Sequence, residues 1–178
     1  MDELSILIHK QYQGLTLNEF LKYFSTSKSV LHMLRMEHAV SINGNQALFD
    51  TLLLENDELI INISTIEERD FLPDDQSIDV VYEDRDYLIV NKPSGLIIHP
   101  DDKQLNNTLV NRISRYYLDN NINRQIRYCH RLDRDTTGAL MIAKHYFIHA
   151  YMANHWDHDH VKRSYLALVF GRFKTESG

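Results

Sequence analysis

The segment from Tyr128 to Lys144 limits the possible folds of this chain more than any other stretch. It contains two arginines, two aspartates, two threonines and one glycine, and it ends in the apolar run Ala139–Ala143. Such an apolar run is typical of a buried strand. Unpaired charges are too costly to bury in a core. The sequence therefore predicts a structured, exposed loop at the edge of a sheet, directly before a buried strand.

Asp133 stands between two cations in this loop, Arg131 and Arg134. Neighbouring guanidinium groups favour the ionised carboxylate, which accepts hydrogen bonds and can act as a nucleophile. The alternative interpretation is a surface hairpin whose charges simply pair, because structural ion-pair networks also contain such carboxylates.

The order of residues from His130 to Gly138, HRLDRDTTG, resembles the active-site motif HRLDRDTSG of the RluA-type pseudouridine synthases. Thr137 stands where that family usually has serine. Upstream, Asn91–Pro100 resembles the family motif NKPAGLxVHP. Downstream, Val161–Gly171 resembles a third motif, in which a basic residue and a tyrosine precede Leu-Ala-Leu-Val and glycine. Ordered motifs are far more specific than a single one.

The resemblance implies an isomerase that converts uridine to pseudouridine within RNA, without a cofactor or a metal. The base leaves its ribose, turns, and rejoins through a ring carbon. Asp133 would be the catalytic carboxylate, attacking either the sugar or the uracil ring. Tyr165 would stack on the target base, with its hydroxyl near the departing proton. Arg131 would take the place of the extruded base in the RNA stack, with His130 and Arg134 as further RNA contacts.

The first 63 residues have the pattern of a small separate module. Thr16 and Glu19 form a capping box for an amphipathic helix over residues 17–24, and Ser27 can cap a second helix that ends near Met36. A strand, an Asn43-Gly44 turn and a closing strand follow. This order resembles the RNA-binding module named after ribosomal protein S-four, which implies that Lys28 and Arg35 on the second helix face RNA. The alternative is an α/β appendage without a ligand.

We therefore expect an α+β protein with three parts. Residues 1–63 form the S-four-like module, 64–76 an acidic linker, and 77–178 part of a catalytic domain with a mixed, antiparallel-rich sheet. The elements predicted in the last part are strands at Val80–Tyr82, Tyr87–Val90, Ala139–Ala143 and Ser164–Val169, and helices beginning after Thr108 and spanning Tyr146–His155.

The net charge of −6 is unevenly distributed. Residues 1–70 contain eleven acidic and five basic residues, whereas the stretch from Lys103 to Arg134 contains seven basic residues against Asp119 and Asp133. The local field near a site matters more than the total charge. We therefore expect a basic surface near the Asp133 loop, formed by Arg112, Arg115, Arg127 and Arg131, and RNA as the partner.

Composition excludes several other classes. Cys129 is the only cysteine, so there is no internal disulfide. The apolar runs are too short to span a bilayer, and the N-terminus has no export signal. We expect a cytoplasmic monomer without a small-molecule cofactor. A metal-dependent hydrolase is a weaker alternative, based on the cluster His145, His149, His155, Asp157, His158, Asp159 and His160.

The family normally has a GRTHQIR-like segment after the third motif, whose arginine pairs with the catalytic aspartate. Residues 171–178 do not supply it. We therefore expect this chain to be part of a longer synthase. A non-catalytic RNA-binding protein on the same scaffold is the alternative. The target RNA, ribosomal or transfer, stays open.

Overall fold

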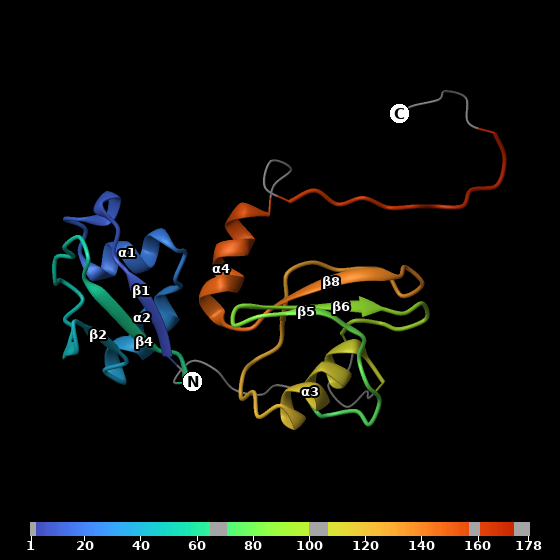
Figure 1. Ribbon diagram of the computed structural model, residues 1–178, viewed down its shortest axis with the longest axis horizontal. Helices are drawn as coiled ribbons and strands as arrows, with labels where there is room; N and C mark the ends of the chain where they lie inside the picture. The colour runs from blue at the N-terminus through green and yellow to red at the C-terminus, as the bar shows by residue number, and fades with distance from the viewer. Residues whose placement is uncertain (1–2, 65–70, 100–106, 157–160, 173–178) are drawn as a thin grey trace.

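The computed structural model describes residues 3–64, 71–99, 107–156 and 161–172. In these ranges the chain forms two four-stranded sheets and four α-helices (Figure 1). All strand pairs in the described ranges are antiparallel. The predicted α+β class is confirmed. None of the helices in these ranges combines the length and hydrophobicity that crossing a bilayer requires.

The N-terminal module contains one sheet, with strand order β1-β4-β2-β3, and two short helices. Its elements are β1 (Glu3–Leu7), a 3-10 turn (Lys10–Tyr12), α1 (Leu17–Tyr23), α2 (Lys28–Met36), β2 (Val40–Ile42), β3 (Asn45–Gln46) and β4 (Glu58–Asn62). Leu17, Leu34 and Leu59, all fully buried, belong to its core. Strand β1 was absent from the sequence prediction, although Leu4 and Ile6 alternate with polar residues.

Local sequence signals explain how the helices and the hairpin of this module begin and end. Thr16 Oγ1 accepts a hydrogen bond from Glu19 N at 3.2 Å, and Thr16 N donates to Glu19 Oε2 at 2.8 Å, which forms the predicted capping box. Ser27 caps α2. Asn43 and Gly44 have φ angles of 51° and 77°, the positive values that a tight two-residue hairpin turn requires.

The second domain places α3 (Leu109–Asp119) on a sheet of strand order β5-β6-β8-β7 (Figure 1). Its other elements are β5 (Val80–Glu83), β6 (Tyr87–Lys92), β7 (Arg127–Tyr128), β8 (Gly138–Ala143) and α4 (Tyr146–His155). The core joins β6 and β8, through Leu88, Val90 and Ile142, to Ile113 and Tyr117 of α3. The two central strands are therefore fixed by hydrophobic burial, and their ends carry the polar loops.

Part of the predicted linker lies on the second domain. Residues 65–70 are outside the described residues, but 71–74 pack along α3. Ser114 Oγ donates to the Phe71 carbonyl at 2.6 Å, and Asn111 Nδ2 donates to the Leu72 carbonyl at 2.8 Å. The division of the chain at residues 63, 64–76 and 77 stays a prediction.

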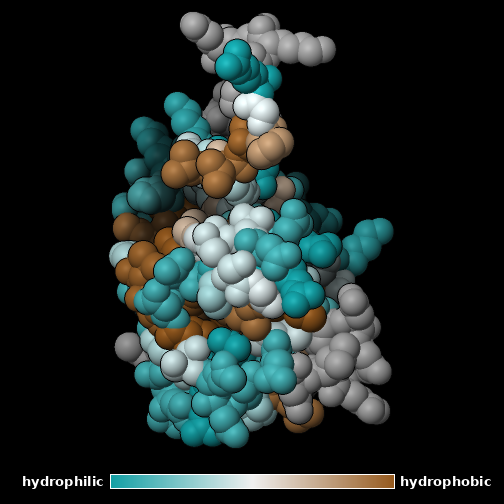
Figure 2. Space-filling view, turned by 90° about the vertical axis from the view of Figure 1, so that its right-hand side faces the viewer, coloured by the Kyte–Doolittle hydropathy of each residue, from teal (hydrophilic) through white to brown (hydrophobic). Residues whose placement is uncertain are grey.

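The predicted strand Ser164–Val169 is wrong for the described structure. Residues 161–169 have no strand assignment, and Leu166, Leu168 and Phe170 are fully exposed. An isolated extended segment has no ladder partner for its backbone groups, so alternating apolar residues alone do not make a strand. Figure 2 shows this apolar segment standing clear at the top of the molecule.

Candidate active site

The register of two central strands brings the first two motifs together. Strands β6 and β8 pair so that Lys92 lies opposite Gly138 and Asn91 opposite Ala139. Strand β6 leads into the turn Pro93–Gly95, and β8 follows the loop that holds Asp133. Because the strands are antiparallel, the end of one and the start of the other meet at the same edge of the sheet. The turn after β6 and the Asp133 loop, about 40 residues apart in the sequence, thus become neighbours.

Lys92 is the residue that fastens these two segments to each other. Its side chain is fully buried, and Nζ donates to three carbonyl oxygens: Pro93 at 3.0 Å, Leu96 at 2.8 Å and Arg134 at 2.8 Å. An ammonium group has three donors, and all three are used. A buried charge is tolerated only when it is fully hydrogen-bonded, so Lys92 fixes the backbone beside Asp133.

Further bonds define the shape of the Asp133 loop, residues 131–137. Ser94 Oγ donates to the Asp135 carbonyl at 3.2 Å, and Arg134 Nε donates to the Gly95 carbonyl at 3.3 Å. Within the loop, Thr136 N donates to the Asp133 carbonyl at 3.1 Å. The loop ends at Gly138, whose φ of 122° is open to glycine but strained for other residues. The backbone is therefore held by the first motif at several points.

The Asp133 side chain is exposed, as are those of Arg131 and Arg134. The structure has no ion pair within 4 Å between Asp133 and either arginine. Arg134 instead turns its guanidinium to the Gly95 carbonyl. The hairpin whose charges simply pair, the alternative weighed from the sequence, is not the arrangement found here.

The nearest buried cation to this loop is Lys92. Burial lowers the pKa of the Lys92 ammonium, while the negative charges of Asp135 and Asp133 act in the opposite direction. Both carboxylates therefore lie close enough to Lys92 to affect its charge.

His130 lies beneath the loop rather than at its surface. It is half-buried, its ring stacks on Trp156 with 5.2 Å between ring centroids, and its Nε2 accepts a hydrogen bond from Met141 N at 3.2 Å. Burial lowers the pKa of His130, and the charge of Arg163 lowers it further. These contacts indicate a neutral, structural histidine. An RNA contact by His130 stays a prediction.

A groove of about 690 Å³ runs beside the loop. Its lining includes Asp135 and Thr136 of the loop and Arg163 and Tyr165 of the extended segment. Tyr165 is 63% exposed. The structure thus brings the second and third motifs to one groove, and Asp133 follows directly after Leu132, which also lines it.

The expected basic surface of Arg112, Arg115, Arg127 and Arg131 stays a prediction, and two of these arginines have acidic partners. On α3, Arg112 lies 3.8 Å from Asp74, and Arg115 pairs with Asp119 at 2.9 Å. Arg127 donates to the Gln125 side chain at 2.6 Å. Arg112 and Arg115 therefore have acidic partners, which reduces the positive charge they add to that of Arg131 and Arg134.

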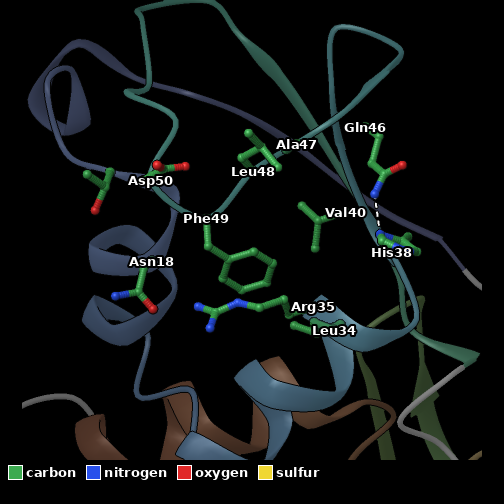
Figure 3. A pocket seen from close by; sticks show the side chains of 11 residues that line it. Asn18, Leu34, Arg35, His38, Val40, Gln46, Ala47, Leu48, Phe49 and Asp50 are labelled. Carbon is green, nitrogen blue, oxygen red and sulfur yellow. Dashed lines mark hydrogen bonds between the residues drawn. The ribbon is translucent and has the colours of Figure 1, made fainter.

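The N-terminal candidates Lys28 and Arg35 lie exposed at opposite ends of α2. Figure 3 shows Arg35 beside Phe49 in the lining of a groove of about 600 Å³, and the Arg35 Cζ lies 4.7 Å from the centre of the Phe49 ring. Close by, the side chains of His38 and Gln46 are hydrogen-bonded to each other. Stacking on an aromatic ring holds a guanidinium flat and leaves its donors available.

Sequence reasoning missed the role of Lys92, although a signal was present. Leu88, Val90 and Lys92 are two residues apart along one strand and all face the core. A lysine at an inward position is a candidate for a buried, multiply bonded role. No group of three or more possible metal-ligating side chains occurs in the described residues, and Asp157–His160 lie outside them.

Comparison with known proteins identifies the family of this chain. The family described as RNA pseudouridylate synthase matches residues 86–178, and the RluD ribosomal pseudouridine synthase N-terminal domain matches residues 4–59. The chain is 31% identical over 176 residues to the uncharacterized RNA pseudouridine synthase YhcT of Bacillus subtilis, covering 98% of this chain and 58% of that protein.

Two further relatives are similar at comparable levels. An uncharacterized RNA pseudouridine synthase of Aquifex aeolicus is 31% identical over 168 residues, covering 91% of this chain and 53% of that protein. Ribosomal large subunit pseudouridine synthase D of Escherichia coli is 33% identical over 119 residues, covering 67% and 36%. The chain thus spans less than two thirds of the length of these relatives. It belongs to the RNA pseudouridylate synthase family and carries an N-terminal domain of the RluD type.

Proposed function

We propose that the protein containing this chain converts uridine to pseudouridine in structured RNA, with Asp133 as its catalytic carboxylate. One observation carries the proposal: buried Lys92 binds the carbonyls of Pro93, Leu96 and Arg134, and so holds an exposed aspartate loop in a fixed shape. Positioning of a reacting group contributes strongly to catalysis. A loop of this sequence would not need so rigid a support if its charges served only for solubility.

The reaction needs a nucleophile, a platform for the base and a way to keep the base out of the RNA stack. Asp133 would attack either the sugar carbon that bears the base or the uracil ring, and both routes stay open. Tyr165, which lines the same groove, would stack on the turned base. Arg131 would fill the space left in the RNA, because a planar guanidinium recovers part of the few kcal/mol that base flipping costs.

The N-terminal module would bind the same RNA through α2. Lys28 and Arg35 are its candidate contacts, and the relatives' names point to large-subunit ribosomal RNA as the first substrate to test. We further propose that the protein acts as a monomer in the cytoplasm and needs no cofactor, since an isomerisation loses no group and involves no redox change.

The proposal is tested by the release of tritium from RNA whose uridines carry it at the fifth ring carbon. The intact protein should release tritium in an RNA-dependent way, because that carbon loses its hydrogen when the new bond forms. Binding of the RNA without release would instead support the non-catalytic RNA-binding protein. If the wild-type protein releases tritium and the Asp133→Asn variant still does so, Asp133 is not the nucleophile.

A further inference from the structure

Helix α4 has a composition unlike that of an ordinary surface helix. Its sequence, YFIHAYMANH, contains no aspartate, glutamate, lysine or arginine, and apolar residues occur around its whole circumference. A helix that is apolar on more than one side is normally buried on more than one side. In Figure 1, α4 stands between the N-terminal module and the second sheet. The contacts of its residues show that it packs on both.

The start of α4 is anchored in the second domain. His145 is buried, and its Nε2 lies 3.0 Å from Asp86 Oδ1 in the turn between β5 and β6. Its Nδ1 accepts from Ile148 N at 3.4 Å and so caps the helix. Next to it, Lys144 N donates to the Asp86 carbonyl at 2.8 Å. The start of α4 is therefore fixed to the turn between β5 and β6.

The next two residues reach into the N-terminal module. Phe147 is 7% exposed and is part of the core of that module rather than of the second domain. Tyr146 Oη accepts a hydrogen bond from Ser27 N at 2.8 Å, and Ser27 is the residue that caps α2. At the other end of α4, Asn154 donates to Ser25 Oγ. The loop between α1 and α2 is thus held along the length of α4.

Tyr146 also has a partner on the catalytic side. The Cζ of Arg127 lies 5.9 Å from the centre of the Tyr146 ring, and Arg127 belongs to β7, the strand that leads into the Asp133 loop. One side chain therefore connects the beginning of the candidate RNA-binding helix to the strand before the candidate nucleophile. A cavity of about 430 Å³ lies beside Phe147 and is also lined by Leu4 and Tyr12 from the module and Tyr87 from β6. Packing between the two units is therefore incomplete beside α4.

From these contacts we infer that α4 sets the distance between the RNA held by α2 and the uridine at Asp133. Phe147 and Tyr146 are then positioning residues that select the target: only a uridine at the matching distance from the bound RNA element reaches Asp133. The inference rests on the proposed function. Its physical basis is effective concentration, since two linked binding sites cooperate only when their geometry allows both to engage.

The test compares two RNAs as substrates of the intact protein. One is a long structured RNA that engages both units, and the other is a short hairpin that carries only the target uridine. Phe147→Ala should lower kcat/KM on the long RNA at least about tenfold, mainly through KM, and leave the hairpin unchanged. Tyr146→Phe, which removes only the hydroxyl, should act in the same direction more weakly. Phe147→Leu, which keeps a large apolar side chain, should retain most of the wild-type kcat/KM on the long RNA.

Two controls keep the result interpretable. Ala153→Asp adds a charge on the exposed side of α4 and should leave kcat/KM on both RNAs unchanged. Cysteines at positions 25 and 154, introduced by Ser25→Cys and Asn154→Cys, should form a crosslink and restore long-RNA turnover to Phe147→Ala. Equal loss on both RNAs, or full activity of Phe147→Ala on the long RNA, would overturn the inference. A wild-type protein inactive on both RNAs would instead refute the proposed function.

Discussion

The two sides of the candidate site differ in how they are held. The Asp133 loop is fixed by buried Lys92 and by hydrogen bonds to the turn after β6. The segment around Tyr165 is extended, and Leu166 and Leu168 within it are fully exposed. Both carry a motif of the same family. The comparison shows that a motif acquires a defined geometry through the contacts that surround it, and sequence identity alone does not supply these contacts.

The largest difference between the sides should appear in catalysis. Asp133→Asn should reduce the rate of pseudouridine formation at least about a thousandfold, because the amide is nearly isosteric but is not a nucleophile. Fold and RNA affinity should be largely kept, since the side chain is exposed. Asp135→Asn is the matched control and should be mild. The measurement is single-turnover formation of pseudouridine by the intact protein.

The stability of the domain that carries the Asp133 loop should depend on the buried Lys92. Lys92→Met keeps the approximate volume but leaves three carbonyl oxygens without their donor, which should cost about 3 kcal/mol of unfolding free energy. Urea unfolding monitored by circular dichroism measures this. Arg134→Met, an exposed neighbour with one bond to Gly95, should cost about 0.5 kcal/mol. Similar losses for the two variants would show that Lys92 is not the anchor of the loop.

The exposed segment around Tyr165 should contribute little to stability but should affect turnover. Tyr165→Phe should change the unfolding free energy by less than about 0.5 kcal/mol, because an exposed side chain away from packed features contributes little. It should nevertheless lower turnover, since the hydroxyl is proposed to lie near the departing proton. A stability loss without a rate effect would identify Tyr165 as a packing residue and remove it from the site.

The last effect concerns the pH dependence of stability and the thiol next to His130. Burial raises the pKa of Cys129 to about 11. The unfolded thiol releases its proton at lower pH than the folded one, so stability should fall as pH rises between the two pKa values. At pH 10 this loss should be about 1 kcal/mol relative to pH 8. It should disappear in Cys129→Ala when the two proteins are unfolded side by side at both pH values.

Local signals predicted much of the fold. The capping residues Thr16 and Ser27, the Asn43-Gly44 turn and the range Tyr146–His155 all depend on neighbours in the sequence, and the structure has them as expected. The α+β class follows from the same patterns. Strand β1 and the failed strand at Ser164–Val169 depend on partners distant in the sequence, which a local pattern does not reveal.

The candidate site follows the same rule. The motifs identified Asp133 and its neighbours, but the three bonds of Lys92 join residues up to 42 positions apart, and only the strand register brings them together. The neutral environment of His130 likewise depends on Trp156, which arrives from the end of α4. Motif spacing carries no information on such contacts.

The most direct test of the central claim is a crystal structure of the intact Asp133→Asn protein bound to an RNA that contains the target uridine. We expect the uridine to be turned out of the RNA, with the side chain at position 133 within about 3.5 Å of the sugar carbon or the uracil ring. The same structure would show which of the two is attacked. A uridine still stacked in its helix, or bound away from the Lys92-supported loop, would contradict the account.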